Sequence, residues 1–270
     1  MLAERVGPDM PVRVRDALCR EAYRRAGIIL GEDKETLLKT RVLRRMRELG
    51  LTDFNEYLRR VERNNEEGEH FVNAITTNTT YFFREGAHFD SITELIRSWR
   101  QGGQRTLRIW CAAASTGQEP YTLAMVAHKA VGFSMDVRIL ATDIDTRALM
   151  EARRAVYPKE QSNRAPLTHR EYFIPAQDGT VTVAPQIKRL VSLGRLNLKE
   201  PPYRMKGPFD LIFCRNVMIY FDIPTRQGIV RESERLLRPG GRLYIGHAES
   251  VNGLTRKLKM LSPSVYERTP

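Results

Sequence analysis

The stretch LRIWCAAASTGQEPYTLAM, residues 107–125, decides how the rest of the chain is interpreted. It begins with a short apolar run typical of a buried strand, passes through small residues, and continues into a helical pattern. Such a strand, turn and helix N-terminus let a ligand approach the backbone closely and meet free amide groups. The turn lacks GxGxxG spacing, so it does not specify a dinucleotide. Glu119 at the helix start disfavours a phosphate and suits a cationic group.

Short apolar runs alternate with helical patterns through the rest of this region. The predicted strands are residues 107–111, 137–142, 190–193, 209–214 and 242–245, with 264–268 as an antiparallel edge strand. This alternation predicts an α/β fold with a Rossmann-like parallel sheet. The segment YFIPAQDGTVTVAP interrupts the pattern, with Asp178-Gly179 as a hairpin turn. We therefore expect a small antiparallel β subdomain inserted at about residues 171–195.

The N-terminal part has a different pattern of apolar residues. Apolar residues recur at intervals of three and four, which predicts an all-helical domain over residues 1–75. Thr52 is the expected cap of the third helix, and Gly50 and Gly68 are expected to end helices. Residues 76–90 are predicted to link this domain to a larger one over residues 91–270.

The second predicted helix is strongly basic. Six cations stand within residues 34–47, with Glu35 as the one acidic residue among them. Arg41, Arg44 and Arg45 share a helix face by their spacing. This face is interpreted either as a solvated surface or as a docking surface for an acidic helix or a phosphate backbone.

Composition narrows the possible functions. The net charge of +12, from 44 basic and 32 acidic residues, favours an acidic partner without saying which kind. No apolar stretch approaches the roughly 20 residues needed to span a bilayer, and the first residues lack a secretion signal, so we expect a cytoplasmic protein without membrane insertion. The three cysteines are expected to be free thiols, and the spacing of the five histidines implies no metal.

Acidic and amide side chains follow two of the predicted strands. Asp143 and Asp145 end RILATDID, where an acid is placed to bind two ribose hydroxyls, although Asp145 is also interpreted as a helix cap. Asn216 and Val217 follow the strand in FDLIFCRNVMIYF, and ERLLRPGGRLYIG has a form common in methyltransferases that use S-adenosylmethionine (SAM). Together with Glu119, these segments favour SAM as the ligand.

Five segments resemble one family beyond its fold. They are TTNTTYFFRE (76–85), AASTGQEPY (113–121), ATDID (141–145), FDLIFCRNVMIYF (209–221) and GHAES (246–250). In this order they are similar to the chemotaxis receptor methyltransferases, the CheR family, over essentially the whole chain. The resemblance implies a SAM-dependent methyltransferase sheet and transfer of a methyl group from SAM to glutamate side chains of chemoreceptors. The products would be glutamate methyl esters and S-adenosylhomocysteine.

The resemblance also implies roles for particular residues. The cofactor would be held by Asn78, Thr80, Arg84, Gly117, Glu119, Asp143, Asn197, Leu198, Asn216 and Val217. Glu119 and Asp143 would contact its amino-acid and ribose portions. From the residues alone, Asn78 and Thr80 fit equally well as turn and cap residues, and Phe82 and Phe83 as core.

A glutamate carboxylate is already ionised at neutral pH, so its methylation requires no general base. Catalysis would rest on alignment and desolvation. Arg84 is the best candidate for orienting the carboxylate, because a guanidinium forks to both oxygens. Tyr220, four residues beyond Asn216, is a candidate to donate a second hydrogen bond, although a packed aromatic is the favoured interpretation.

The resemblance gives the basic helix a target in the glutamate-rich coiled-coil helices of chemoreceptors, with Arg41, Arg44 and Arg45 docking a monomeric enzyme on them. The turn AQDGT lacks the longer glycine-flanked insertion of members that hold a receptor's C-terminal peptide, so we expect a tether-independent enzyme.

Two rival interpretations remain from the sequence. A nucleic-acid methyltransferase fits the charge, and EPPY at residues 200–203 resembles a base-flipping loop. That loop should follow the fourth strand, whereas EPPY precedes it, so nucleic acid is not the expected partner. A non-catalytic SAM or nucleotide sensor is the second rival, and the pocket motifs with Arg84 weigh against it.

Overall fold

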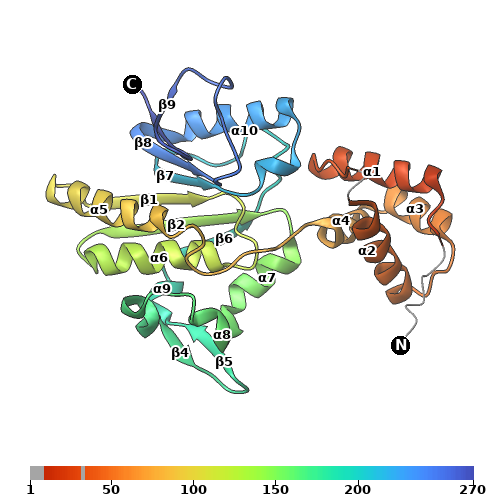
Figure 1. Ribbon diagram of the computed structural model, residues 1–270, viewed down its shortest axis with the longest axis horizontal. Helices are drawn as coiled ribbons and strands as arrows, with labels where there is room; N and C mark the ends of the chain where they lie inside the picture. The colour runs from red at the N-terminus through yellow and green to blue at the C-terminus, as the bar shows by residue number, and fades with distance from the viewer. Residues whose placement is uncertain (1–8, 32–33) are drawn as a thin grey trace. The chain divides into compact units, whose positions relative to one another are not determined.

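The computed structural model describes residues 9–31 and 34–270. The chain divides into two compact units (Figure 1). One comprises the residues up to Thr77 together with Tyr220–Asp222, and the other comprises Asn78–Ile219 and Ile223–Pro270. Within the described residues, no helix has the length and apolar character required to cross a bilayer.

The N-terminal unit is helical, as predicted. Its helices are α1 (Val12–Ala26), α2 (Glu35–Glu48), α3 (Phe54–Arg63) and α4 (Asn65–Ile75). Their apolar stripes meet in one core, in which Leu18, Leu38 and Tyr57 are fully buried. Burial of these faces stabilises helices of this length, which are marginal in isolation.

Two local predictions in this unit are wrong. The cap of α3 is Asp53 and not Thr52, because the Asp53 carboxylate accepts the Asn55 N–H at 2.9 Å. Gly68 does not end a helix but lies inside α4, where a Cβ would come 2.1 Å from Arg25 Cζ. The glycine leaves the space that the Arg25 guanidinium occupies. Gly50 does follow the end of α2, with a φ of 68°.

The larger unit is built on a seven-stranded sheet with the order β6-β2-β1-β7-β8-β10-β9. Its strands are β1 (Thr106–Cys111), β2 (Asp136–Asp143), β6 (Val191–Arg195), β7 (Phe209–Cys214), β8 (Leu237–Ile245), β9 (Leu258–Ser262) and β10 (Val265–Arg268). The pairs from β6 to β8 are parallel, whereas β10 pairs antiparallel with β8 and β9. The α/β class is therefore confirmed, but β10 lies inside the sheet and β9 forms its edge.

Helices accompany the strands as the alternation predicts. They are α5 (Ala87–Gln101), α6 (Gln118–Val131), α7 (Thr146–Arg154) and α10 (Ile223–Leu236), and Figure 1 shows α5 and α6 running along the sheet. The central strands are the most deeply buried, and every residue of β7 is buried. This burial on both faces explains why four consecutive residues of β7, residues 211–214, are apolar.

A second, three-stranded antiparallel sheet has the order β3-β5-β4, from β3 (Val156–Pro158), β4 (Phe173–Pro175) and β5 (Thr180–Val183). The short helices α8 (Lys159–Ser162), η2 (Leu167–Tyr172) and α9 (Pro185–Lys188) adjoin these strands in sequence. The predicted antiparallel subdomain is present, but it begins earlier, because β3 pairs with β5. The residues of β6 belong to the main sheet.

Candidate functional site

Four neighbouring parallel strands, β6, β2, β1 and β7, end at the same edge of the main sheet. The carboxyl edge of such a sheet is where α/β proteins bind ligands. The segments that follow these four strands contain most of the predicted pocket residues. The fold therefore gathers residues that lie far apart in the sequence.

The turn between β1 and α6 is anchored to both neighbouring strands. The Ala112 N–H donates to the Phe213 carbonyl at 2.7 Å, and the Ala114 N–H donates to the Thr142 carbonyl at 2.9 Å. Gly117 has a φ of 98°, and a Cβ on it would come 2.7 Å from the Tyr157 hydroxyl oxygen. Close packing and the positive φ thus require the glycine at position 117.

Glu119 lies in the first turn of α6 and is largely buried. Its carboxylate accepts a hydrogen bond from the Cys111 thiol at 3.3 Å and lies 3.2 Å from Arg215 Nη1. Burial raises the pKa of Glu119, and the Arg215 charge acts against this rise. A buried carboxylate in this position is suited to receiving an ammonium or sulfonium group.

Asp143 is the last residue of β2. Its carboxylate accepts the Ser115 N–H at 2.7 Å and the Asp145 N–H at 2.9 Å, while burial raises its pKa. Asp145 caps α7 by accepting the N–H groups of Arg147 and Ala148, as its cap interpretation requires. Asp143 is thereby held rigidly at the sheet edge, in a position that fits a ribose diol.

Asn78 connects these two acidic loops. Its amide donates to Asp145 Oδ2 at 2.8 Å and accepts the Ser115 hydroxyl at 3.0 Å. Thr80 follows as a half-buried residue. Asn78 therefore holds the turn after β1 and the turn after β2 in a fixed relation.

Arg84 is partly exposed on the same segment. Its Nη1 donates to the Thr79 carbonyl at 2.9 Å, and its guanidinium lies 5.9 Å from the centre of the Tyr81 ring. Phe82 beyond it is fully buried against Tyr157 and Phe173, which confirms its core interpretation, while Phe83 is partly buried.

The segments after β6 and β7 contribute amide and apolar groups. Asn197 donates to Glu200 Oε1 at 2.8 Å, and Leu198 is buried. Asn216 Nδ2 lies 3.3 Å from Glu85 Oε1, and Val217 is half-buried. These residues reach the sheet edge, but the roles proposed for them stay predictions.

The sequence interpretation missed Arg215, whose side chain is 0% exposed. Its guanidinium lies 3.0 Å from Glu85 Oε2 and 3.2 Å from Glu119 Oε2, and it donates to the Arg84 carbonyl at 2.7 Å. One buried cation thus joins the segment of Arg84 to the start of α6. A charged residue directly after the apolar run of residues 211–214 was the available clue.

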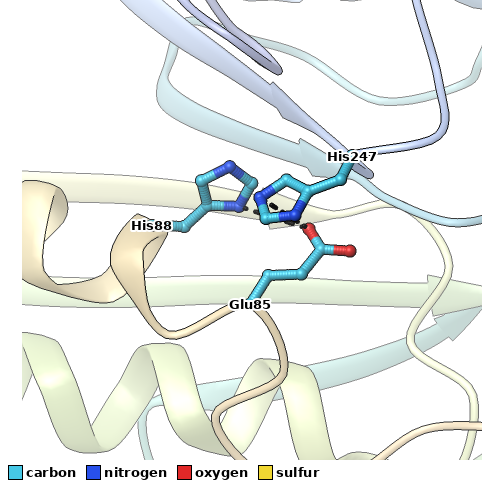
Figure 2. A group of neighbouring side chains, drawn as sticks. All are labelled: Glu85, His88 and His247. Atoms are coloured by element: carbon cyan, nitrogen blue, oxygen red, sulfur yellow. Dashed lines mark ion pairs between the residues drawn. The ribbon is translucent and has the colours of Figure 1, made fainter.

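Glu85, His88 and His247 form a cluster that the sequence spacing did not predict (Figure 2). His88 Nδ1 and His247 Nε2 each lie 3.7 Å from Glu85 Oε2. Burial, followed by the Arg215 charge, lowers the pKa of His88 to about 4, so its imidazole is neutral at neutral pH. These ligand types could hold a metal ion, but Arg215 shares the same carboxylate oxygen and its positive field opposes a cation.

Tyr220 ends the short helix η3 (Met218–Tyr220) and groups with the helical unit. Its carbonyl accepts the Ile29 N–H at 2.9 Å, and Lys34 Nζ lies 4.6 Å from the centre of its ring. Its predicted catalytic role stays a prediction.

Two of the three predicted docking arginines are engaged inside the helical unit. Arg41 donates to the carbonyls of Ala74 and Thr76. Arg45 forks to the buried Glu67, at 3.0 and 2.8 Å. Arg44 is 78% exposed and lies 3.5 Å from Glu48. Arg41 and Arg45 link α2 to α4 and to the residue that follows it. Of the three predicted docking arginines, Arg44 is therefore the one with a largely exposed side chain.

Comparison with protein families decides the assignment. Residues 78–266 match the model described as CheR methyltransferase, SAM binding domain, and residues 16–76 match the CheR methyltransferase, all-alpha domain. The chain belongs to the CheR methyltransferase family. It is a SAM-dependent methyltransferase of bacterial chemotaxis. Both the family and the cofactor were correctly predicted from the sequence.

The chain is similar in sequence to chemotaxis protein methyltransferases over most of their length. The chain is 41% identical to the chemotaxis protein methyltransferase of Salmonella typhimurium, over 92% of this chain and 88% of that protein. It is 42% identical to the corresponding protein of Escherichia coli, over 90% and 86%. Among solved structures, a TehB-like SAM-dependent methyltransferase from Corynebacterium glutamicum is 15% identical, covers 68% of this chain and 100% of that chain, and has a TM-score of 0.39.

The carboxylates of the CheR site predict a pH dependence of SAM affinity. Because burial raises the pKa values of Glu119 and Asp143, both take up a proton at a higher pH than an exposed acid does. As predicted ligands of the cofactor, the two carboxylates would favour it by their negative charge, so SAM affinity is expected to fall as the pH decreases from neutral into the acidic range. Calorimetric titration of the full chain with SAM across this range measures the effect. A constant affinity would contradict it.

Proposed function

We propose that this CheR protein methylates glutamate side chains of chemoreceptors, forming methyl esters. The observation that carries the proposal is the arrangement at the carboxyl edge of the sheet. The buried acids Glu119 and Asp143 suit the cofactor, while the partly exposed Arg84 offers its guanidinium on the segment that Arg215 joins to Glu119. The site thus combines acceptors for a cation with a donor for an incoming anion.

Bound SAM supplies an activated methyl group on its sulfonium. Transfer of this methyl group to a glutamate carboxylate oxygen would form the ester, and S-adenosylhomocysteine would leave with the electron pair of the broken carbon–sulfur bond. Arg84 orients the carboxylate by forking to both oxygens. Tyr220 donates a further hydrogen bond. No side chain needs to remove a proton, because the nucleophile is already ionised.

The proposal is tested with SAM labelled on the methyl group and membranes that contain chemoreceptors. We expect label on the receptor that alkali releases as methanol, as an ester requires. Label that is stable to alkali, or label that appears on nucleic acid in a parallel filter assay, would contradict the proposal.

The structure weighs against the nucleic-acid alternative at EPPY. Tyr203 is buried, its hydroxyl donates to the Leu198 carbonyl at 2.8 Å, and its ring lies 5.6 Å from that of Trp110. An aromatic that stacks on a flipped base must be accessible. Tyr203 is instead part of the support for the pocket loop.

Docking on an acidic coiled coil predicts a charge effect at Arg44. The Arg44→Glu variant is expected to raise the KM for receptor membranes several-fold at low salt, because rim charges steer association. The difference should shrink at high salt. Arg63→Glu, which changes an exposed cation on α3, is the matched control. Equal KM values for the Arg44 variant and wild type would count against this docking face.

Tether independence is expected from the turn between β4 and β5. That connection is short, with φ values of 58° at Asp178 and 70° at Gly179, and the Thr180 N–H donates to the Gln177 carbonyl at 3.2 Å. Titration of the full chain with a receptor's C-terminal pentapeptide is expected to show no micromolar binding. Heat of binding in that range would reverse this assignment.

A further inference from the structure

Glu249 accepts an unusual number of backbone hydrogen bonds. It lies in the segment after β8, and its Oε2 accepts the N–H groups of Asn216 at 2.8 Å and Gly246 at 2.6 Å. Its Oε1 accepts those of Val217 at 2.9 Å and Met218 at 2.7 Å. Both carboxylate oxygens are therefore used, and three of the four donors are consecutive residues of the loop after β7.

That loop has a conformation that requires support. Asn216 has a φ of 57°, in the left-handed region that side chains disfavour. Three successive N–H groups point towards one place and would repel one another without an anion between them. The Glu249 carboxylate supplies this anion from within the chain.

Gly246 shows that the two segments were brought together as closely as the backbone allows. A Cβ at this position would come 2.4 Å from Asn216 Nδ2, 2.9 Å from Asn216 N and 2.9 Å from Glu249 Oε2. A side chain here would push the loop after β7 away from the carboxylate. Gly246 thus allows the close approach of the loop after β7, and Glu249, three residues later, binds the N–H groups of that loop.

The loop held in this way is central to the site. It begins with Arg215, whose guanidinium lies between Glu85 and Glu119, and it continues with Asn216 beside Glu85. A shift of the loop would move the cation that partners Glu119. The position of Glu249 therefore bears on the cofactor carboxylate without Glu249 touching it.

We propose that Glu249 is a positioning residue, which fixes the loop of residues 215–218 and thereby places Arg215 and Glu119 for SAM. This inference rests on the proposed contact between Glu119 and the cofactor. It adds Glu249 and Gly246 to the residues on which cofactor affinity depends.

The Glu249→Gln variant tests the proposal in the full chain. The amide keeps one acceptor oxygen, and its NH₂ group faces two N–H donors. We expect the dissociation constant for SAM, measured by calorimetry, to rise about tenfold or more. Gly246→Ala should act in the same direction, and Glu249→Asp, which keeps both oxygens, should be less impaired than the glutamine variant. Glu151→Gln, at an exposed position on α7, should match wild type.

Thermal melting of the same variants separates positioning from simple support of the fold. A lower melting temperature with SAM affinity within about twofold of wild type would overturn the proposal. Loss of folding in all three variants, Glu249→Gln, Glu249→Asp and Gly246→Ala, would also overturn it. If the Glu119→Gln variant binds SAM with the affinity of wild type, the proposed contact between Glu119 and the cofactor is refuted instead. The two failures are thus distinguishable.

Discussion

Replacing Arg84 with alanine is expected to lower kcat on receptor membranes by about a hundredfold or more, with the fold unchanged. The guanidinium is partly exposed, and its Nη1 donates a hydrogen bond to the nearby Thr79 carbonyl at 2.9 Å. Its removal therefore costs little packing. The incoming carboxylate loses the fork that would align one oxygen with the methyl group, so the loss should appear in turnover.

Arg164→Ala is the matched control for this variant. The Arg164 guanidinium lies 4.4 Å from the centre of the Tyr81 ring, the same ring that Arg84 approaches at 5.9 Å. The Arg164→Ala variant loses a comparable cation near the same aromatic ring, and its turnover should stay near that of wild type. Arg84→Lys keeps the positive charge but loses the two-pronged guanidinium, so its turnover should lie between that of Arg84→Ala and that of wild type. Wild-type turnover in Arg84→Ala would refute the orienting role.

Arg215→Met is expected to destabilise the protein by about 3–5 kcal/mol, because it leaves two buried carboxylates without their cation. Burial acts to raise the pKa of Glu85, but the Arg215 charge and the Asn216 amide lower it below its usual value. Urea unfolding of the variant and wild type measures the difference in free energy.

The control for this change is Arg138→Met. Arg138 pairs with Asp136 at 3.0 Å, but its side chain is 69% exposed, so water screens the pair. Its loss should cost at most about 1 kcal/mol. Equal effects of the two substitutions would show that Arg215 does not stabilise the buried glutamates.

The sequence predicted the parts of this protein that depend on local pattern. The strand, small-residue turn and helix at residues 107–125 are present because burial on both sheet faces and close packing at Gly117 leave a strong local imprint. Gly68 was misinterpreted because the side chain packed against it, Arg25, is distant in the sequence. The strand β10 was misinterpreted as an edge because β9, which lies just before it in the sequence and covers its outer side, was not recognised as a strand.

The same limit applies to the site. Glu119 and Asp143 could be proposed as site residues from the sequence because each lies close to the end of a recognisable strand. Arg215, by contrast, pairs with Glu85 across a long stretch of sequence, and no period or spacing encodes this contact. The basic face of α2 shows the converse error, since spacing places Arg45 on a surface but cannot reveal that Glu67 lies opposite it.

Mass spectrometry of receptor peptides tests the central claim most directly. Full-length enzyme is incubated with receptor membranes and SAM that has a deuterated methyl group, and the modified peptides are sequenced. Deuterated methyl groups on glutamate side chains, abolished in Arg84→Ala and retained in Arg164→Ala, are the predicted result. Methyl groups on any other residue type, or equal glutamate labelling by both variants, would contradict the account.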